Sequence, residues 1–313
     1  MQYHLYIIYI IYIESSVDEW RRQHARLGPI ALGSDLTQPH IAMLNYLLMD
    51  TLQNQEYLRR QYEDSRNLGA RIDLHTRFST EEHPWFHWVF DRFEIPEKAR
   101  VIELGCGTGL LWRENLSRIP HGWSITLTDA SPGMVREAEE GLRRTALGFT
   151  FAEVNAVSIP YDNDTFDSVI ANHMLYHVPD LDRTLSEIRR VLKPGGRLYA
   201  TTVGLNHMAE LREVPRDLGI RTPDGSVQTF TQFNLDNSAS DLGHWFAEVE
   251  LERRNGALMV TEAAPLVDYV LSGTRLSDEE TARLRASFDS EIQLRGAFRI
   301  STETGIFKAI RGS

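Results

Sequence analysis

Strands alternate with helices between Ala99 and Val203, and this alternation most strongly constrains the fold. Strands are predicted for "ARVIELG", "SITLTD", "FTFAEVNA", "FDSVIAN" and "RLYATTV". Helices are predicted for "LLWRENLSRI", for "SPGMVREAEEGLRRTA" with Ser131 as its N-cap, and for "DLDRTLSEIRRVLK", which "PGG" ends. Such repeated units predict a doubly wound α/β domain, a parallel sheet with helices on both faces. Ligands of these sheets bind at the carboxyl ends of the strands.

A glycine-rich loop follows the first strand, where "VIELGCGTGLLW" contains Gly105, Gly107 and Gly109. Glycines at a strand-to-helix turn let the backbone approach a ligand closely, because a side chain there would collide with it. The loop therefore indicates a nucleotide-type cofactor. Its G-x-G-x-G spacing differs from the G-x-G-x-x-G of dinucleotide-binding folds, which disfavours a NAD(P)-linked oxidoreductase but keeps it as an alternative.

Side chains at the ends of the next two strands fit the same kind of cofactor. Asp129 ends the second strand, where a carboxylate can accept hydrogen bonds from both hydroxyls of a ribose. Asn155 follows the third strand and can meet an adenine edge, with an apolar wall formed by Ala156, Val157 and Ile159.

These residues resemble the class I S-adenosylmethionine (SAM) dependent methyltransferases, in the small-molecule group that includes ubiquinone-type and natural-product enzymes. The resemblance runs from about Ala99 to Val203, through "ELGCGTG", "LTDASPGM", "NAVSIPYDNDTFD", "ANHMLYHVPD" and "EIRRVLKPGGRLYATT". It implies a Rossmann-like, mostly parallel seven-stranded sheet whose last strand is antiparallel, for which "GIFKAI" is the candidate. The implied cofactor is SAM, converted to S-adenosylhomocysteine (SAH), and no metal is expected.

The resemblance also implies roles for individual residues. Glu103 and the glycine loop would hold the amino-acid part of SAM, Asp129 the ribose, and Met134 would lie near the adenine. The family usually has aspartate where this chain has Asn155, so we expect weaker but intact adenine recognition. Cys106 is interpreted as a packing residue rather than a nucleophile. The full predicted cofactor set is Glu103, Gly105, Cys106, Gly107, Gly109, Asp129, Ala130, Met134, Asn155, Ala156, Val157, Asn172 and His173.

Histidines follow the fourth and fifth strands, at the edge where the substrate is expected. Methyl transfer requires the accepting atom and the methyl carbon to meet in line at about 3 Å. A base is needed only where that atom carries a proton, and histidine is well suited to the task. A zinc site is disfavoured because no third carboxylate or cysteine ligand is in register. The catalytic candidates are His173, His177, Tyr176 and His207, of which His173 is the preferred base.

Segments before the first strand are expected to cover the substrate. In "NLGARIDLHTRF", Arg71 and His75 lie four apart on one helical face, where they could bind a polar or anionic substrate. In "STEEHPWFHWVFDRF", a helix predicted to begin at Ser79 or Thr80, Trp85 and Trp88 would enclose it. The alternatives are an ion-paired helix face for Arg71 and Arg77, and core packing for the aromatic residues.

Composition limits the partners and the compartment. The net charge is −11, with 33 Lys and Arg against 44 Asp and Glu, so we expect a small-molecule substrate and no nucleic acid. Cys106 is the only cysteine, which excludes an internal disulfide and suggests a reducing, cytoplasmic location. The apolar run Leu5–Ile13 is shorter than the ~20 residues of a spanning helix, so no membrane span is expected.

The predicted organisation has three parts. They are an N-terminal extension over 1–38, a helical cap over 39–95 and a methyltransferase domain over 96–313, with helical insertions around 204–245 and 262–297. The N-terminal helices could form a contact between copies of the chain, so the sequence is compatible with a homo-oligomer. The predicted function is methyl transfer from SAM to O, N or C of a small, partly apolar metabolite, of a kind typical of secondary metabolism. Besides the oxidoreductase, the alternative is a non-catalytic SAM-binding scaffold.

Overall fold

The computed structural model describes residues 66–145, 147–220 and 232–313. All the described residues belong to a single compact unit. The predictions for the 1–38 extension, for the run Leu5–Ile13, for cap residues before Arg66 and for an oligomer through the N-terminal helices lie outside the described residues.

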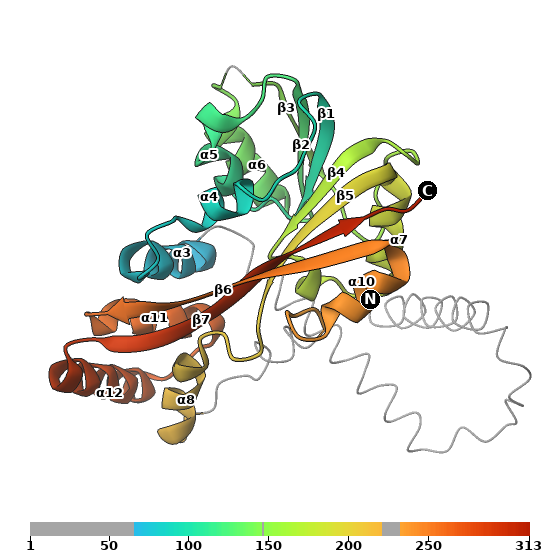
Figure 1. Ribbon diagram of the computed structural model, residues 1–313. Helices are drawn as coiled ribbons and strands as arrows, with labels where there is room; N and C mark the ends of the chain where they lie inside the picture. The colour runs from blue at the N-terminus through green and yellow to red at the C-terminus, as the bar shows by residue number, and fades with distance from the viewer. Residues whose placement is uncertain (1–65, 146, 221–231) are drawn as a thin grey trace, which may run out of the picture. The chain divides into compact units, whose positions relative to one another are not determined.

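The described residues form a seven-stranded sheet in the order β3-β2-β1-β4-β5-β7-β6 (Figure 1). β1 to β5 pair in parallel, while β7 lies antiparallel between β5 and β6. The predicted mostly parallel sheet is therefore confirmed, with "GIFKAI" inside its antiparallel strand. The strands are β1 (Ala99–Leu104), β2 (Trp123–Asp129), β3 (Phe149–Glu153), β4 (Phe166–Asn172), β5 (Leu192–Val203), β6 (Glu248–Val260) and β7 (Phe298–Ile310).

Helices cover both faces of this sheet because successive strand residues point to opposite sides. In β1, Val101 packs into a core with helices α4 (Trp85–Phe90), α5 (Leu110–Arg113) and α6 (Pro132–Leu142). The next residue, Ile102, packs into the opposite core with α7 (Leu181–Val191) and α10 (Ser238–Trp245). β1 lies between β2 and β4, so the order of the strands reverses at its carboxyl end. Ligands of open α/β sheets bind at this position.

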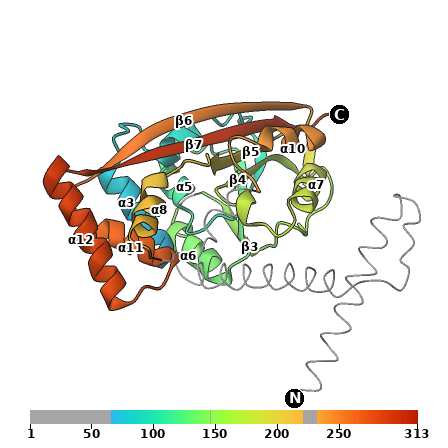
Figure 2. The ribbon, with the colours of Figure 1, turned by 90° about the horizontal axis from the view of Figure 1, so that it is seen from below.

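The β6–β7 hairpin continues beyond the end of β5. Val203, the last residue of β5, pairs with Thr304, whereas β6 and β7 pair with each other as far as Val260 and Phe298. A third apolar core lies on this extension. Figures 1 and 2 both show its helices beside the β6–β7 hairpin. Its helices are α3 (Arg66–Phe78), α8 (Ala209–Asp217), α11 (Ala263–Gly273) and α12 (Asp278–Arg295). The hairpin extension thus fixes α3, which carries Arg71 and His75.

Three of the predicted helix boundaries differ from those of the structure. α4 begins at Trp85, not at Ser79 or Thr80, because Thr80 donates its backbone N–H to Ala257 O of β6 at 2.9 Å. The helix after the glycine loop ends at Arg113, where Asn115 donates to Leu111 O at 2.7 Å, and a 3₁₀ turn follows. "PGG" lies inside β5 and follows a helix that already ends at Val191.

Candidate functional site

The glycine loop lies at the carboxyl end of β1 and closes against the segment that follows β4. Gly105, Gly107 and Gly109 all have positive φ angles of 53° to 74°, which side-chain-bearing residues rarely adopt. A Cβ atom on Gly105 would lie 2.8 Å from Cβ of Met174. Cys106 N–H donates to Thr128 O at 2.8 Å, which ties the loop to β2. The loop therefore presents bare backbone at the switch point of the sheet.

Gly105→Ala is expected to destabilise the protein more than Gly195→Ala, which is its matched control. Both glycines have positive φ, but the space around Gly195 is open. Gly195→Ala therefore adds only the backbone cost of about 1–2 kcal/mol. Gly105→Ala should add about 1–3 kcal/mol for displacing Met174. Urea unfolding measures both, and equal losses would show that the loop is not closely packed against Met174.

Glu103 is a buried carboxyl group directly behind the loop. It is 1% exposed, and its Oε2 accepts a hydrogen bond from Trp112 Nε1 at 2.6 Å. Burial raises the pKa of Glu103 to about 8, against the opposing effect of the Trp112 hydrogen bond, and the charge of Asp129 raises it further. A cationic ligand group placed beside Glu103 would favour its ionised form.

Asp129 joins the glycine loop to the start of α6. Its carboxylate accepts N–H groups from Gly107 at 3.0 Å and from Ser131 at 2.8 Å. Burial raises the pKa of Asp129, while the hydrogen bonds from the backbone of Ser131, Gly107 and Ala130 oppose that rise. The Ser131 side chain accepts from Met134 N–H at 3.3 Å, so the predicted N-cap of α6 is confirmed.

Other predicted cofactor residues lie in the segments that follow β2 and β3. Met134 and Ala156 are buried, with 1% and 6% of their surfaces exposed. Asn155 is exposed, and its Oδ1 accepts from Val157 N–H at 3.2 Å, which closes a small turn after β3. Burial raises the pKa of the Cys106 thiol, which keeps it protonated, in line with its interpretation as a packing residue.

β5 holds the segment after β4 in an unusual backbone conformation. His173 has a φ of 53°, and its N–H donates to Thr201 Oγ1 at 3.0 Å. The same Thr201 hydroxyl donates to Asn172 Oδ1 at 2.6 Å. A left-handed backbone at a bulky residue costs free energy and persists only where its surroundings enforce it. Thr201, which the sequence analysis did not single out, thus positions both predicted residues.

Four histidines from three parts of the chain lie together here. His173 and His177 belong to this segment, His75 to α3, and His207 follows β5. His75 of α3 stacks on His207 at 6.0 Å between ring centres, and the ring of His177 lies 4.4 Å from that of Tyr176. His173 packs against Trp85, with 5.1 Å between ring centres. The structure thus brings together all four catalytic candidates and two of the predicted substrate residues, His75 and Trp85.

Burial lowers the pKa of all four histidines. The values fall to about 4 for His75 and His173 and to about 3 for His177. The pKa of His207 lies well below its ordinary value, chiefly through burial and then through His75 and His173. The four rings are therefore neutral at pH 7. His207 Nδ1 accepts the Glu303 N–H at 3.0 Å, so its own proton lies on Nε2.

The other predicted substrate residues lie at the margin of this group. Arg71 Nε donates to Ser272 Oγ of α11 at 3.4 Å, and its charge contributes to the lowered pKa of His177. Trp88 is 7% exposed and stacks behind Trp85 at 5.3 Å. Arg77 forms ion pairs with Asp73 at 3.2 Å and Glu262 at 2.8 Å, as the ion-paired alternative predicted.

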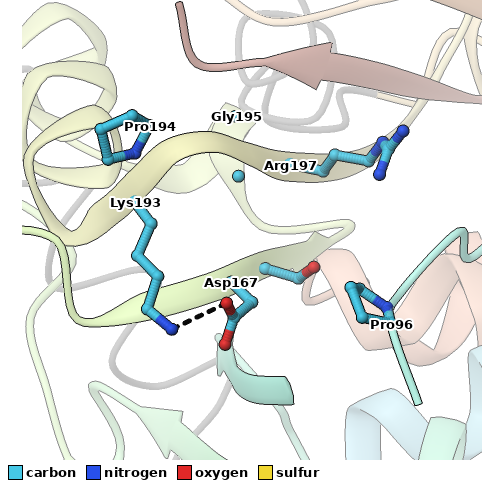
Figure 3. A pocket seen from close by; sticks show the side chains of 8 residues that line it. Pro96, Asp167, Lys193, Pro194, Gly195 and Arg197 are labelled. Atoms are coloured by element: carbon cyan, nitrogen blue, oxygen red, sulfur yellow. Dashed lines mark hydrogen bonds and ion pairs between the residues drawn. The ribbon is translucent and has the colours of Figure 1, made fainter. Parts of the chain in front are cut away.

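Other features of the described ranges lie apart from this group. Among residues 66–145, 147–220 and 232–313, no group of three or more His, Cys, Asp or Glu side chains could hold a metal ion. No helix in these ranges is long and apolar enough to cross a membrane. A surface hollow (Figure 3) opens at the amino ends of β4 and β5, at the edge opposite the glycine loop. An ion pair of 2.7 Å between Lys193 and Asp167 lines it, and it includes none of the predicted site residues.

Comparisons with known proteins agree with the motifs. Residues 102–200 match the family described as "Methyltransferase domain". Over 119 residues the chain is 33% identical to a malonyl-[acyl-carrier protein] O-methyltransferase of Paenibacillus sp. (strain JDR-2), covering 37% of this chain and 43% of that protein. It is 31% identical over 119 residues to the ubiquinone/menaquinone biosynthesis C-methyltransferase UbiE of Pectobacterium carotovorum, covering 36% and 47%. The chain thus spans less than half the length of these relatives.

A solved structure is also similar to this chain. It is a phosphoethanolamine N-methyltransferase 2 of Haemonchus contortus in complex with S-adenosyl-L-methionine, at 18% identity and a TM-score of 0.49. The similarity covers 83% of this chain and 60% of that one. The family match and the sequence relatives agree with the order of the motifs and with the topology of the sheet. Residues 102–200 therefore carry a methyltransferase domain of the class I SAM-dependent group.

Proposed function

We propose that the chain transfers a methyl group from SAM to an O, N or C atom of a small, partly apolar metabolite. The observation that carries the proposal is the junction of the glycine loop with Asp129 at the switch point, where the neutral histidines after β4 and β5 gather. A small-molecule acceptor, a reducing cytoplasmic setting and a role in secondary metabolism belong to the same proposal. The net charge of −11 and the single cysteine support its first two parts.

The residues at the junction suit the parts of SAM. The left-handed glycines place loop backbone instead of side chains at the end of β1, and Met174 of the chain itself fills the position that a Cβ on Gly105 would take. Glu103 would draw the methionine ammonium group, and Asp129 would accept hydrogen bonds from the ribose hydroxyls. Met134, Ala156 and Val157 would flank the adenine. When bound, SAM supplies an electrophilic methyl group on a sulfonium.

The chain's own residues would position the His173 ring, exclude water from the reacting atoms and accept a proton. Thr201 holds the His173 backbone, so that the ring packs against Trp85. Burial keeps the ring neutral, so it can accept a proton from a hydroxyl, amine or acidic C–H of the acceptor. Trp85 and Tyr176 would exclude water from the reacting atoms.

Label transfer from SAM tests this function. The purified chain is incubated with SAM carrying a radioactive methyl group and with fractionated metabolite extracts. We expect label in the small-molecule fraction and equimolar release of SAH. A protein that binds SAH tightly but labels nothing would instead support the non-catalytic scaffold, and label confined to macromolecules would exclude a metabolite acceptor.

A further inference from the structure

Three buried polar atoms around the Trp85 indole lack a hydrogen-bond partner among the residues that the structure describes. They are Trp85 Nε1, His173 Nδ1 and Arg254 Nη1. The centre of the His173 ring lies 5.1 Å from that of Trp85, and the Arg254 guanidinium carbon lies 6.0 Å from it. Trp85 Nε1 and Arg254 Nη1 are N–H donors, whereas His173 Nδ1 donates or accepts according to the tautomer of the neutral ring. Leaving a buried N–H without an acceptor is costly, so such a pair of donors is typical of a ligand site.

The three residues come from separate elements that meet at the carboxyl edge of the sheet. Trp85 begins α4, His173 follows β4, and Arg254 lies on β6. Arg254 pairs with Thr304, which in turn pairs with Val203 at the end of β5. Residues so distant in sequence converge here because the β6–β7 hairpin pairs with β5 and brings Arg254 level with the end of that strand.

Arg254 is held in place through its other nitrogens. Its side chain is 10% exposed, its Nε lies 3.5 Å from Glu81 Oε2, and its Nη2 donates to His83 O. Its guanidinium also packs 5.5 Å from the centre of the Trp88 ring. Burial lowers the pKa of Arg254, while the attraction of Glu81 opposes this effect. These contacts fix the guanidinium and leave Nη1 for another acceptor.

The ionisable groups around this position favour a negatively charged ligand. No acidic side chain contributes to the pKa of His75, His173, His177 or His207. In contrast, the charge of Arg71 lowers the pKa of His177, and the charge of Arg212 lowers that of His207. The acids of the neighbouring strand and helix are paired through one oxygen only. Glu303 Oε1 lies 3.4 Å from Arg253 and Glu210 Oε1 accepts the Ser301 N–H at 3.0 Å, while Oε2 of each is buried without a hydrogen-bond partner among the described residues. Among the ion pairs and hydrogen bonds of the described residues, only the Glu81 carboxylate pairs with Trp85, His173 or Arg254.

We propose that the methyl acceptor is an organic acid whose carboxylate binds Trp85 Nε1 and Arg254 Nη1 beside His173. The proposal rests on the proposed function, because it takes this group of donors as the acceptor side of the SAM site. A carboxylate has two oxygens and can accept both N–H groups at once. His173 lies next to the bound carboxylate. The substrate atom that loses its proton to His173 is therefore close to that carboxylate in the substrate.

Calorimetric titration of model acids tests this site directly. The probes are acetate, benzoate and salicylate, each paired with its methyl ester, together with phenyl phosphate, all with and without SAH. We expect at least one acid to bind about tenfold more tightly than its ester, as a charge-assisted hydrogen bond would give. Trp85→Phe, which keeps a ring but removes the N–H, and Arg254→Lys should each weaken binding of that acid by about tenfold.

Two variants serve as matched controls. Trp123→Phe removes an indole N–H that donates to Pro96 O at 2.8 Å, away from the site. Arg253→Lys makes the same change as Arg254→Lys at the neighbouring position, where the arginine pairs with Asp236 at 2.7 Å. Both should bind the acid within about twofold of the unsubstituted chain, below the effect of one charge-assisted hydrogen bond.

Several outcomes would overturn the carboxylate site. They are equal binding of acids and esters, no binding of any acid, unchanged affinity in Trp85→Phe, and tighter binding of phenyl phosphate than of every acid. An equal loss in Arg253→Lys and Arg254→Lys would show that Arg254 acts only as a structural residue. SAH titration gives a separate answer. If the acids bind as expected but SAH does not, the proposed function fails while the carboxylate site stands.

Discussion

Replacing His173 with asparagine is expected to lower kcat by about 10²–10⁴-fold, the usual contribution of a positioned acid or base. Asparagine tolerates the left-handed backbone that His173 adopts at a φ of 53°, so the substitution removes the imidazole without forcing the chain to move. Its N–H can still donate to Thr201. Affinity for SAH should therefore stay within about threefold, because the glycine loop and Asp129 are unchanged.

The pH dependence distinguishes a base from a residue that only fills space. Burial, together with the smaller effect of His75, lowers the pKa of His173 to about 4, so the reactive neutral form persists from about pH 5 upward. Because the His173 ring stays neutral between pH 5 and 8, we expect its titration to cause no change in kcat/KM over this range. Below about pH 4, protonation removes the base, and the rate should fall about tenfold per pH unit. Full turnover in His173→Asn with bound SAM would remove this residue from the mechanism.

Asp129→Ala is expected to weaken binding of SAM and SAH by about 10- to 100-fold, the range for hydrogen bonds to a charged group. The alanine also releases the N–H groups of Gly107 and Ser131 that Asp129 now accepts at 3.0 and 2.8 Å. The free energy of unfolding should therefore fall as well. Calorimetry with SAH measures the first effect and urea unfolding the second.

Glu153→Ala is the matched control for Asp129→Ala. Glu153 ends β3, pairs with Asp129 in the register of the sheet, and is exposed. Removing it takes away an acid of the same charge at the same edge without affecting the glycine loop. We expect SAH affinity within about twofold of the unsubstituted chain, as for surface positions. Equal losses in both variants would mean that only the general negative charge of the edge matters.

The sheet and the cofactor side could be predicted because their signals are local. A strand, a glycine turn with positive φ and a Ser131 cap each need only a few neighbouring residues. The predicted strands from Ala99 to Val203 therefore pair in the expected parallel manner. The motif order places Glu103 and Asp129 on adjacent strands, which pair as β1 and β2.

The substrate side could be predicted only in part, because long-range pairing builds it. The alternation in "AEVELERR" predicts a strand, but not that this strand pairs with β7 and brings Arg254 level with the end of β5, beside Trp85. The same hairpin contacts Thr80, which is why α4 does not start where its capping residues suggest. Likewise, Arg71 and His75 share a helical face, but only the folded chain stacks His75 on His207.

The central claim is that the carboxyl edge of this sheet binds SAM, and titration with SAH tests it most directly. A ligand at one hundred times its dissociation constant stabilises a folded protein by about 2.7 kcal/mol. We predict that saturating SAH raises the melting temperature of the chain and binds with one-to-one stoichiometry, while NAD does neither. A melting shift with NAD and none with SAH would contradict the account.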